Sequence, residues 1–150
     1  MAHYESKRGL VSKSQPELYM SFVDLSNFTK MLPEQYKDSV TATYDTLSAS
    51  IQGFSLAVAV DERRPYDKIR VISTNSPVEF CVVLHFDMAA TAGKTEFWIE
   101  LDANLNLVMK AMLGGKIKEA LDKVVQGLED VSNGKMPEGM PADFNPGNYR

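Results

Sequence analysis

The sequence predicts an α+β fold in which a curved antiparallel sheet of about six strands wraps around one long C-terminal helix. Two observations carry this prediction. Apolar residues recur at three- and four-residue steps from Asn104 to Val131, as one face of a helix requires. The segments before this helix alternate apolar and polar side chains, as strands with one buried face do. The apolar side of the helix must be buried, and the strands offer the only large apolar surface for it.

Composition limits the class of protein. A chain of 150 residues with 44% hydrophobic residues is long enough for a single domain with its own core. Sixteen basic and twenty acidic residues give a net charge of -4 without a basic stripe, so we expect no nucleic-acid partner. The single cysteine, Cys81, excludes an internal disulfide and fits a reducing cytoplasm. No apolar run approaches about 20 residues and the N-terminus is polar, so we expect a cytoplasmic protein without stable membrane insertion.

The N-terminal elements are a strand and two short helices. The strand is expected over Tyr4–Val11. Ser14 and Glu17 have the spacing of a capping box, which predicts the start of the first helix. A second helix is expected to begin near Asp24, to carry Phe28, Met31 and Leu32, and to end at Pro33, because proline cannot continue a helix.

The middle of the chain predicts a meander of strands. They are expected over Ser39–Gln52, Phe54–Val60, Lys68–Thr74, Val78–Met88 and Thr95–Asp102. Strand alternation places Arg70 on the outer face, paired with Glu79 or an equivalent acid. After position 133 the chain becomes rich in proline and glycine. We therefore divide it into a domain over residues 1–133 and a tail over 134–150.

The long helix contains Gly114 and Gly115, which together cost it about 2 kcal/mol relative to alanine. They predict either a hinge at the mouth of a cavity, or a helix boundary or close packing on the sheet.

The order of a strand, two short helices, a meander and a long C-terminal helix matches the helix-grip fold. The stretches Ser14-Gln15-Pro16-Glu17-Leu18-Tyr19 and Phe22-Val23-Asp24-Leu25-Ser26-Asn27-Phe28 also resemble the opening of the START-like superfamily. This superfamily is also called SRPBCC and includes polyketide cyclases, coenzyme-Q-binding proteins and plant allergen-type lipid binders. The resemblance in pattern covers roughly residues 4 to 131.

The resemblance implies a cavity between the concave face of the sheet and the long helix. The expected ligand-binding residues are apolar and come from both surfaces: Phe80, Val82, Leu84, Phe86, Phe97, Ile99, Leu101, Met109, Met112 and Leu113. Methionine side chains adapt to varied ligands, which suits this role. A fully packed core would produce the same pattern, and that alternative stays open.

The leading hypothesis is non-catalytic binding of a small hydrophobic ligand, such as a lipid, a quinone or a polyketide-like metabolite. The alternatives are an enzyme of the polyketide cyclase or hydratase type and a protein-interaction module. His85 is expected on the outer face, where Val83 and Trp98 could form a homodimer contact. His3, His85 and Cys81 are far apart in sequence. We therefore predict no catalytic residues, no metal site and no cofactor.

Overall fold

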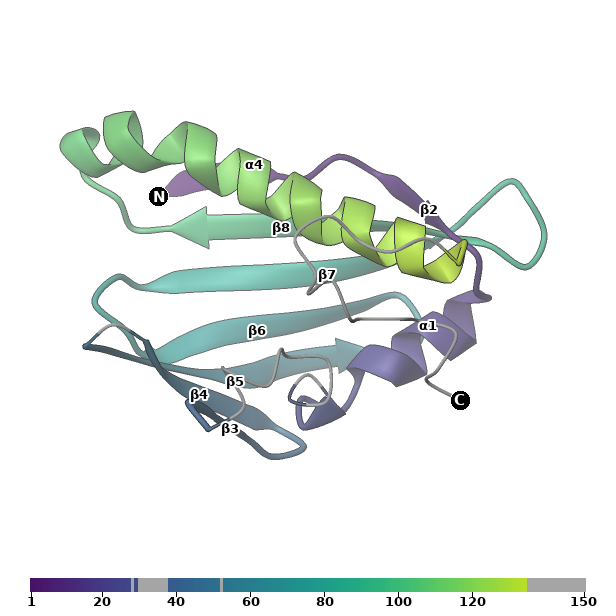
Figure 1. The fold of residues 1–150 in the computed structure, drawn as a ribbon, viewed down its shortest axis with the longest axis horizontal. Helices are drawn as coiled ribbons and strands as arrows, with labels where there is room; N and C mark the ends of the chain where they lie inside the picture. Colours follow the sequence, from purple (N-terminus) through teal and green to yellow (C-terminus); the bar gives the residue numbers. More distant parts are fainter. Residues whose placement is uncertain (28, 30–37, 52, 135–150) are drawn as a thin grey trace.

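The computed structural model describes residues 1–27, 29, 38–51 and 53–134. Within these residues one antiparallel sheet contains eight strands (Figure 1). The strands are β1 (Ala2–Glu5), β2 (Gly9–Val11), β3 (Val40–Ala42), β4 (Thr46–Ile51), β5 (Phe54–Arg64), β6 (Lys68–Asn75), β7 (Phe80–Met88) and β8 (Thr95–Ala103). Their order across the sheet is β1-β8-β7-β6-β5-β4-β3, and β2 also pairs with β8.

The sheet has eight strands rather than about six because two predicted strands are each divided. The expected strand Tyr4–Val11 is interrupted at Ser6, whose backbone N–H donates to the carbonyl of Ile99 (2.8 Å) while its hydroxyl accepts from the Ile99 N–H (2.8 Å). The expected strand Ser39–Gln52 turns back on itself, where the Thr43 N–H donates to the Thr46 carbonyl (2.8 Å). Both breaks depend on hydrogen bonds that strand alternation does not reveal.

The register of the sheet places the predicted apolar residues on one face. Across β7 and β8 the paired residues are Phe86 with Phe97, Leu84 with Ile99, and Val82 with Leu101. Strands β5 and β6 extend this face, since Val60 pairs with Val71 and Val71 with Val82. This is the inner face of the sheet, against which the helices pack.

Helix α1 (Gln15–Phe22) begins with the predicted capping box. The Ser14 hydroxyl accepts from the Glu17 N–H (3.4 Å), and the Glu17 carboxylate accepts from the Ser14 N–H (3.5 Å). The helix packs against β7. The apolar residues and the terminating proline of the predicted second helix, Phe28, Met31, Leu32 and Pro33, lie outside the described residues, as do residues 135–150 of the predicted tail.

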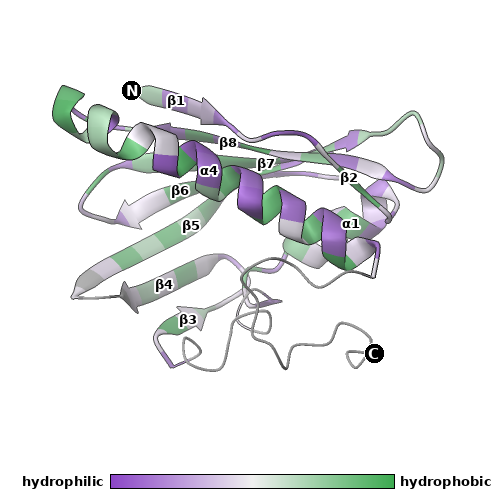
Figure 2. Cartoon of the chain, turned by 45° about the horizontal axis from the view of Figure 1, so that its top comes forward, coloured by the Kyte–Doolittle hydropathy of each residue, from purple (hydrophilic) through white to green (hydrophobic). Residues whose placement is uncertain are grey.

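Helix α4 (Leu107–Ser132) is the predicted long helix and continues without interruption through Gly114 and Gly115. It begins at Leu107 rather than Asn104, because the side-chain carbonyl of the N-cap residue Asn106 accepts from the Met109 N–H (2.9 Å). The helix packs mainly against β1, β2 and β8, along one side of the sheet (Figures 1 and 2). Strands β4, β5 and β6 extend away from it.

Candidate functional site

The apolar stripe of α4 is wider than the surface that the sheet covers. Val125 is fully buried, and Leu121 and Leu128 pack against the same core cluster. Other residues of the stripe remain exposed, with exposed fractions of 37% for Leu113 and 56% for Val124. One edge of the helix's apolar surface is therefore open to solvent.

The inner face of the sheet also carries apolar side chains that are only partly covered. Val58 and Val60 on β5 and Val82 on β7 are half-buried and pack at the margin of the core cluster. Ile69 and Val71, on the strand between them, are buried. Val58, Val60 and Val82 thus pack against the same core cluster as Leu121 and Leu128 of α4. With the neighbouring exposed edge of the helix, these positions form the candidate site.

One end of the inner face is closed by aromatic packing beneath α1. Phe22 stacks on Phe97 with ring centroids 5.6 Å apart, and Phe86 lies 5.5 Å from Phe97. Tyr19 meets Phe86 edge-on at 5.7 Å, and burial raises the pKa of its phenol. This end is solid core.

Arg63 fixes the border between α1 and the outer strands. Its guanidinium donates to the carbonyls of Val23 (3.0 Å) and Tyr44 (2.7 Å) and to the Asp45 carboxylate (2.6 Å). It also lies 4.1 Å above the Tyr44 ring. Arg63 is thus occupied by structural contacts at one end of the inner face.

The ten predicted ligand-binding residues fall into three groups. Four are buried in the core: Leu84, Phe86, Phe97 and Ile99. Four are partly covered: Phe80, Val82, Leu101 and Met109. Two on α4 are exposed, Met112 at 68% and Leu113 at 37%. The first group can form only the floor of a site, whereas the other two offer surface.

Sequence reasoning missed several residues that border the candidate site: Val58, Val60, Leu121, Val124 and Leu128. Val58 and Val60 belong to a predicted strand. Leu121, Val124 and Leu128 belong to the predicted apolar stripe of the helix. The missing information was the position of α4, because only the packed structure shows which edge of the stripe stays uncovered.

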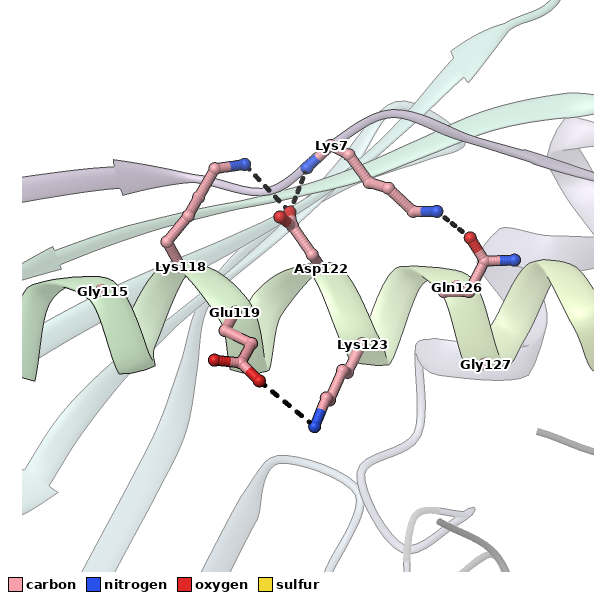
Figure 3. A pocket seen from close by; sticks show the side chains of 8 residues that line it. All are labelled: Lys7, Gly115, Lys118, Glu119, Asp122, Lys123, Gln126 and Gly127. Carbon is pink, nitrogen blue, oxygen red and sulfur yellow. Dashed lines mark hydrogen bonds and ion pairs between the residues drawn. The ribbon is translucent and has the colours of Figure 1, made fainter. Parts of the chain in front are cut away.

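A hollow of about 360 Å³, lined mainly by charged side chains, lies on another side of α4 (Figure 3). There the Asp122 carboxylate accepts from the Lys7 backbone N–H (2.6 Å) and from the Lys118 ammonium (2.9 Å). Lys7 also donates to the Gln126 side chain. These contacts tie the segment between β1 and β2 to the helix, so this hollow is part of the attachment of α4.

A second hollow, of about 510 Å³, lies at one end of β6 and β7 and is lined by Arg70, Cys81, Glu79 and Asp102 among others. Arg70 pairs with Asp61, an acid equivalent to the predicted partner Glu79, and donates through Nε to the Cys81 sulfur (3.1 Å). Neither hollow is lined by the inner face beneath the apolar edge of α4.

His85 lies on the outer face of the sheet, as strand alternation predicts. Its ring stacks on Trp98 with centroids 3.9 Å apart and contacts the Glu100 carboxylate through Nε2. Arg8 lies 4.1 Å from the centre of the Trp98 ring system. Trp98, which the sequence suggested as part of a homodimer contact with Val83, is therefore covered in part by polar neighbours.

No protein-family model and no curated protein sequence matches the chain. Solved structures share its fold at low sequence identity. A START superfamily protein from Mycobacterium smegmatis shares 16% identity at a TM-score of 0.59, with 85% of this chain and 96% of that chain covered. A protein from Thermobifida fusca shares 12% identity at a TM-score of 0.66, with 89% and 94% covered. The Aha1 dimer from Colwellia psychrerythraea shares 11% identity at a TM-score of 0.52, with 81% and 97% covered.

These likenesses show the fold. The chain has the START-like fold that its sequence resembles, with a curved antiparallel sheet and a long C-terminal helix. Among the described residues, no helix is long and apolar enough to span a membrane.

Proposed function

We propose that this chain, whose fold is START-like, binds an apolar small molecule between the exposed edge of α4 and the inner face of the sheet, without catalysis. The exposure of Val124 carries the proposal. Leu121 and Leu128, its neighbours in the apolar stripe, contact the core. Val124 itself is 56% exposed to solvent. An apolar ligand at this edge would remove its surface from water, at about 25 cal/mol per Å² buried.

The division of the predicted residues supports a ligand resting on the core. The partly covered side chains of Val82 and Leu101 would contact the ligand from the sheet, and Leu113 would contact it from the helix. The buried pairs of β7 and β8 would form a rigid floor beneath it. The likeness to a START superfamily protein favours a ligand-binding role, and a lipid, a quinone or a polyketide-like metabolite fits the apolar lining.

The polyketide cyclase or hydratase alternative is less well supported. It calls for a polar pair directed at the inner face, and His85 points away from that face toward Glu100 on the outside. Arg63, which lies near the inner face, is held by the contacts to Val23, Tyr44 and Asp45.

The test uses two valines on nearly opposite sides of α4. Val124 is 56% exposed on the apolar edge, and Val108 is 66% exposed away from it. Delipidated protein is titrated with cis-parinaric acid and, separately, with decylubiquinone. We expect saturable binding of one of these probes that Val124→Glu weakens at least about tenfold, or about 1.4 kcal/mol, because a carboxylate would be buried against the ligand.

The matched variant Val108→Glu should bind that probe like the wild type. Both substitutions are at exposed positions, so their melting temperatures should stay close to that of the parent. Absence of saturable binding to either probe, or equal weakening by both variants, would contradict the proposal.

A second candidate function is self-association through the start of α4. Leu107, Val108 and Met112 are exposed at 83%, 66% and 68%, and together they form an apolar patch. The similar Aha1 protein is a dimer. Size-exclusion chromatography with light scattering should show a dimer that Val108→Glu dissociates and Val124→Glu leaves intact. A monomeric wild-type protein at high concentration would exclude this role.

A further inference from the structure

A histidine and three carboxylates meet on the outer face of β1 and β8. Cross-strand pairing puts Glu5 opposite Glu100 and His3 opposite Asp102. Because positions two apart in a strand share a face, all four side chains project to the same side. Like charges directly opposite each other destabilise a sheet, so the pairing of Glu5 with Glu100 calls for a cation between them.

His3 lies among these carboxylates. Its Nδ1 lies 2.7 Å from Asp102 Oδ1, and its Nε2 lies 3.0 Å from Glu5 Oε2 and 3.7 Å from Glu100 Oε2. One imidazole thus lies among three carboxylates.

We propose that His3, Glu5 and Glu100 form a binding site for a divalent transition-metal cation of the Zn²⁺ class. Their ligand atoms, one from each side chain, all lie within 4.8 Å of one another. Ligand atoms about 2.1 Å from a tetrahedral zinc ion are about 3.4 Å apart. The two separations from His3 Nε2, 3.0 and 3.7 Å, bracket this spacing. Small side-chain rotations would therefore complete the geometry.

Asp102 gives His3 the orientation that a metal-binding histidine needs. Metal-ligating imidazoles usually donate their other ring N–H to a carboxylate, which fixes the tautomer and the direction of the ring. The Nδ1 contact to Asp102 is of this kind and leaves Nε2 facing Glu5 and Glu100. Glu100 is further held through its other oxygen by His85. The cluster thus has ligands and supporting residues, which distinguishes it from a group of surface acids.

The ion would join β1 to β8. His3 and Glu5 come from β1, and Glu100 comes from β8, so a bound ion bridges the two strands. One imidazole and two carboxylates suit a borderline cation, with water in the remaining position. This inference is independent of the proposed apolar ligand, because the site lies on the opposite face of the sheet.

The test is a titration of metal-free protein with Zn²⁺, on a chain that carries no histidine tag. Because the ligands must lose their protons, the titration is made at about pH 8. We expect one equivalent to bind and to raise the melting temperature. His3→Ala and Glu5→Gln should abolish both effects, and Asp102→Asn should weaken binding by about tenfold or more.

Glu96→Gln is the matched control. Glu96 lies on the same strand and the same face as Glu100, but its carboxylate pairs with Arg8, outside the cluster. This variant should bind Zn²⁺ like the wild type. His3 and Glu5 are exposed, so their variants should keep the metal-free melting temperature of the parent. Failure of the wild type to bind, equal weakening by Glu96→Gln, or displacement of Zn²⁺ by equimolar Mg²⁺ would overturn the proposal.

Discussion

Gly9 and Val125 pack so closely that a Cβ atom added to Gly9 would lie 2.5 Å from Cγ1 of Val125. Gly9 is buried in β2, and Val125 is the fully buried residue of α4. The absence of a side chain at Gly9 therefore lets the helix approach the sheet at this point. This contact helps to set the position of α4 along one side of the sheet, and thereby which edge of its apolar stripe remains open.

We predict that Gly9→Ala lowers the free energy of unfolding by about 1–3 kcal/mol, because the new methyl group overpacks a closed interface. Urea denaturation of the variant and the wild type measures the difference. If Gly9→Ala costs little in a Val125→Ala background, relative to Val125→Ala alone, the clash is the cause. A single variant as stable as the wild type would show that α4 can shift away without cost.

We predict that alanine stabilises the protein more at Gly115 than at Gly114, the two adjacent glycines of α4. Apart from its chain neighbours and the helix's own backbone, no atom lies within 4 Å of a Cβ built at Gly115, so Gly115→Ala should raise stability by about 1 kcal/mol through helix propensity. A Cβ at Gly114 would lie 3.3 Å from the Tyr4 hydroxyl, so Gly114→Ala should gain less or lose stability. Thermal melts of the two single variants compare them. A larger gain at Gly114 would contradict the packing of Tyr4 on the helix.

We predict that the stabilising contribution of Asp122 is lost in acid. Burial raises the pKa of this carboxyl, but hydrogen bonds from the Lys7 N–H and from Lys118 outweigh it and hold the pKa below its ordinary value. A depressed folded pKa means that the contribution is full above about pH 4 and is lost as the pH falls through the folded value.

Asp122→Asn should therefore cost about 1 kcal/mol at neutral pH and progressively less in acid. Urea denaturation of both proteins at neutral pH and at about pH 3 gives the two differences. Lys123→Gln, which removes only the ion pair with Glu119 on the same helix, is the control and should change stability little. An equal cost of Asp122→Asn at both pH values would rule out the proposed linkage.

Local patterns were sufficient for most of the fold. The spacing of Ser14 and Glu17 predicted the capping box of α1, and alternation predicted that Val82 and Leu84 would share a face with Leu101 and Ile99. These features depend on residues close in sequence or on a fixed period, which a single sequence displays directly.

Features that depend on long-range contacts could not be predicted. The break at Ser6 is set by its hydrogen bonds with Ile99, and the cluster around His3 forms only when β1 pairs with β8. The prediction of no metal site rests on sequence distance, which does not reveal that His3 and His85 both contact Glu100 in the structure. Which edge of α4 stays uncovered likewise depends on a long-range contact, the close packing of the helix on Gly9.

The most direct test of the proposed apolar site is methyl NMR with a spin-labelled fatty acid, 16-doxyl-stearate. The account predicts that the bound label broadens the methyl signals of Val58, Val60 and Val124, which border the candidate site. The methyl signals of Val83, on the outer face, and of Val108, away from the apolar edge, should broaden less than these. Broadening confined to Val83 or Val108, or no broadening at saturating label, would contradict binding between α4 and the inner face of the sheet.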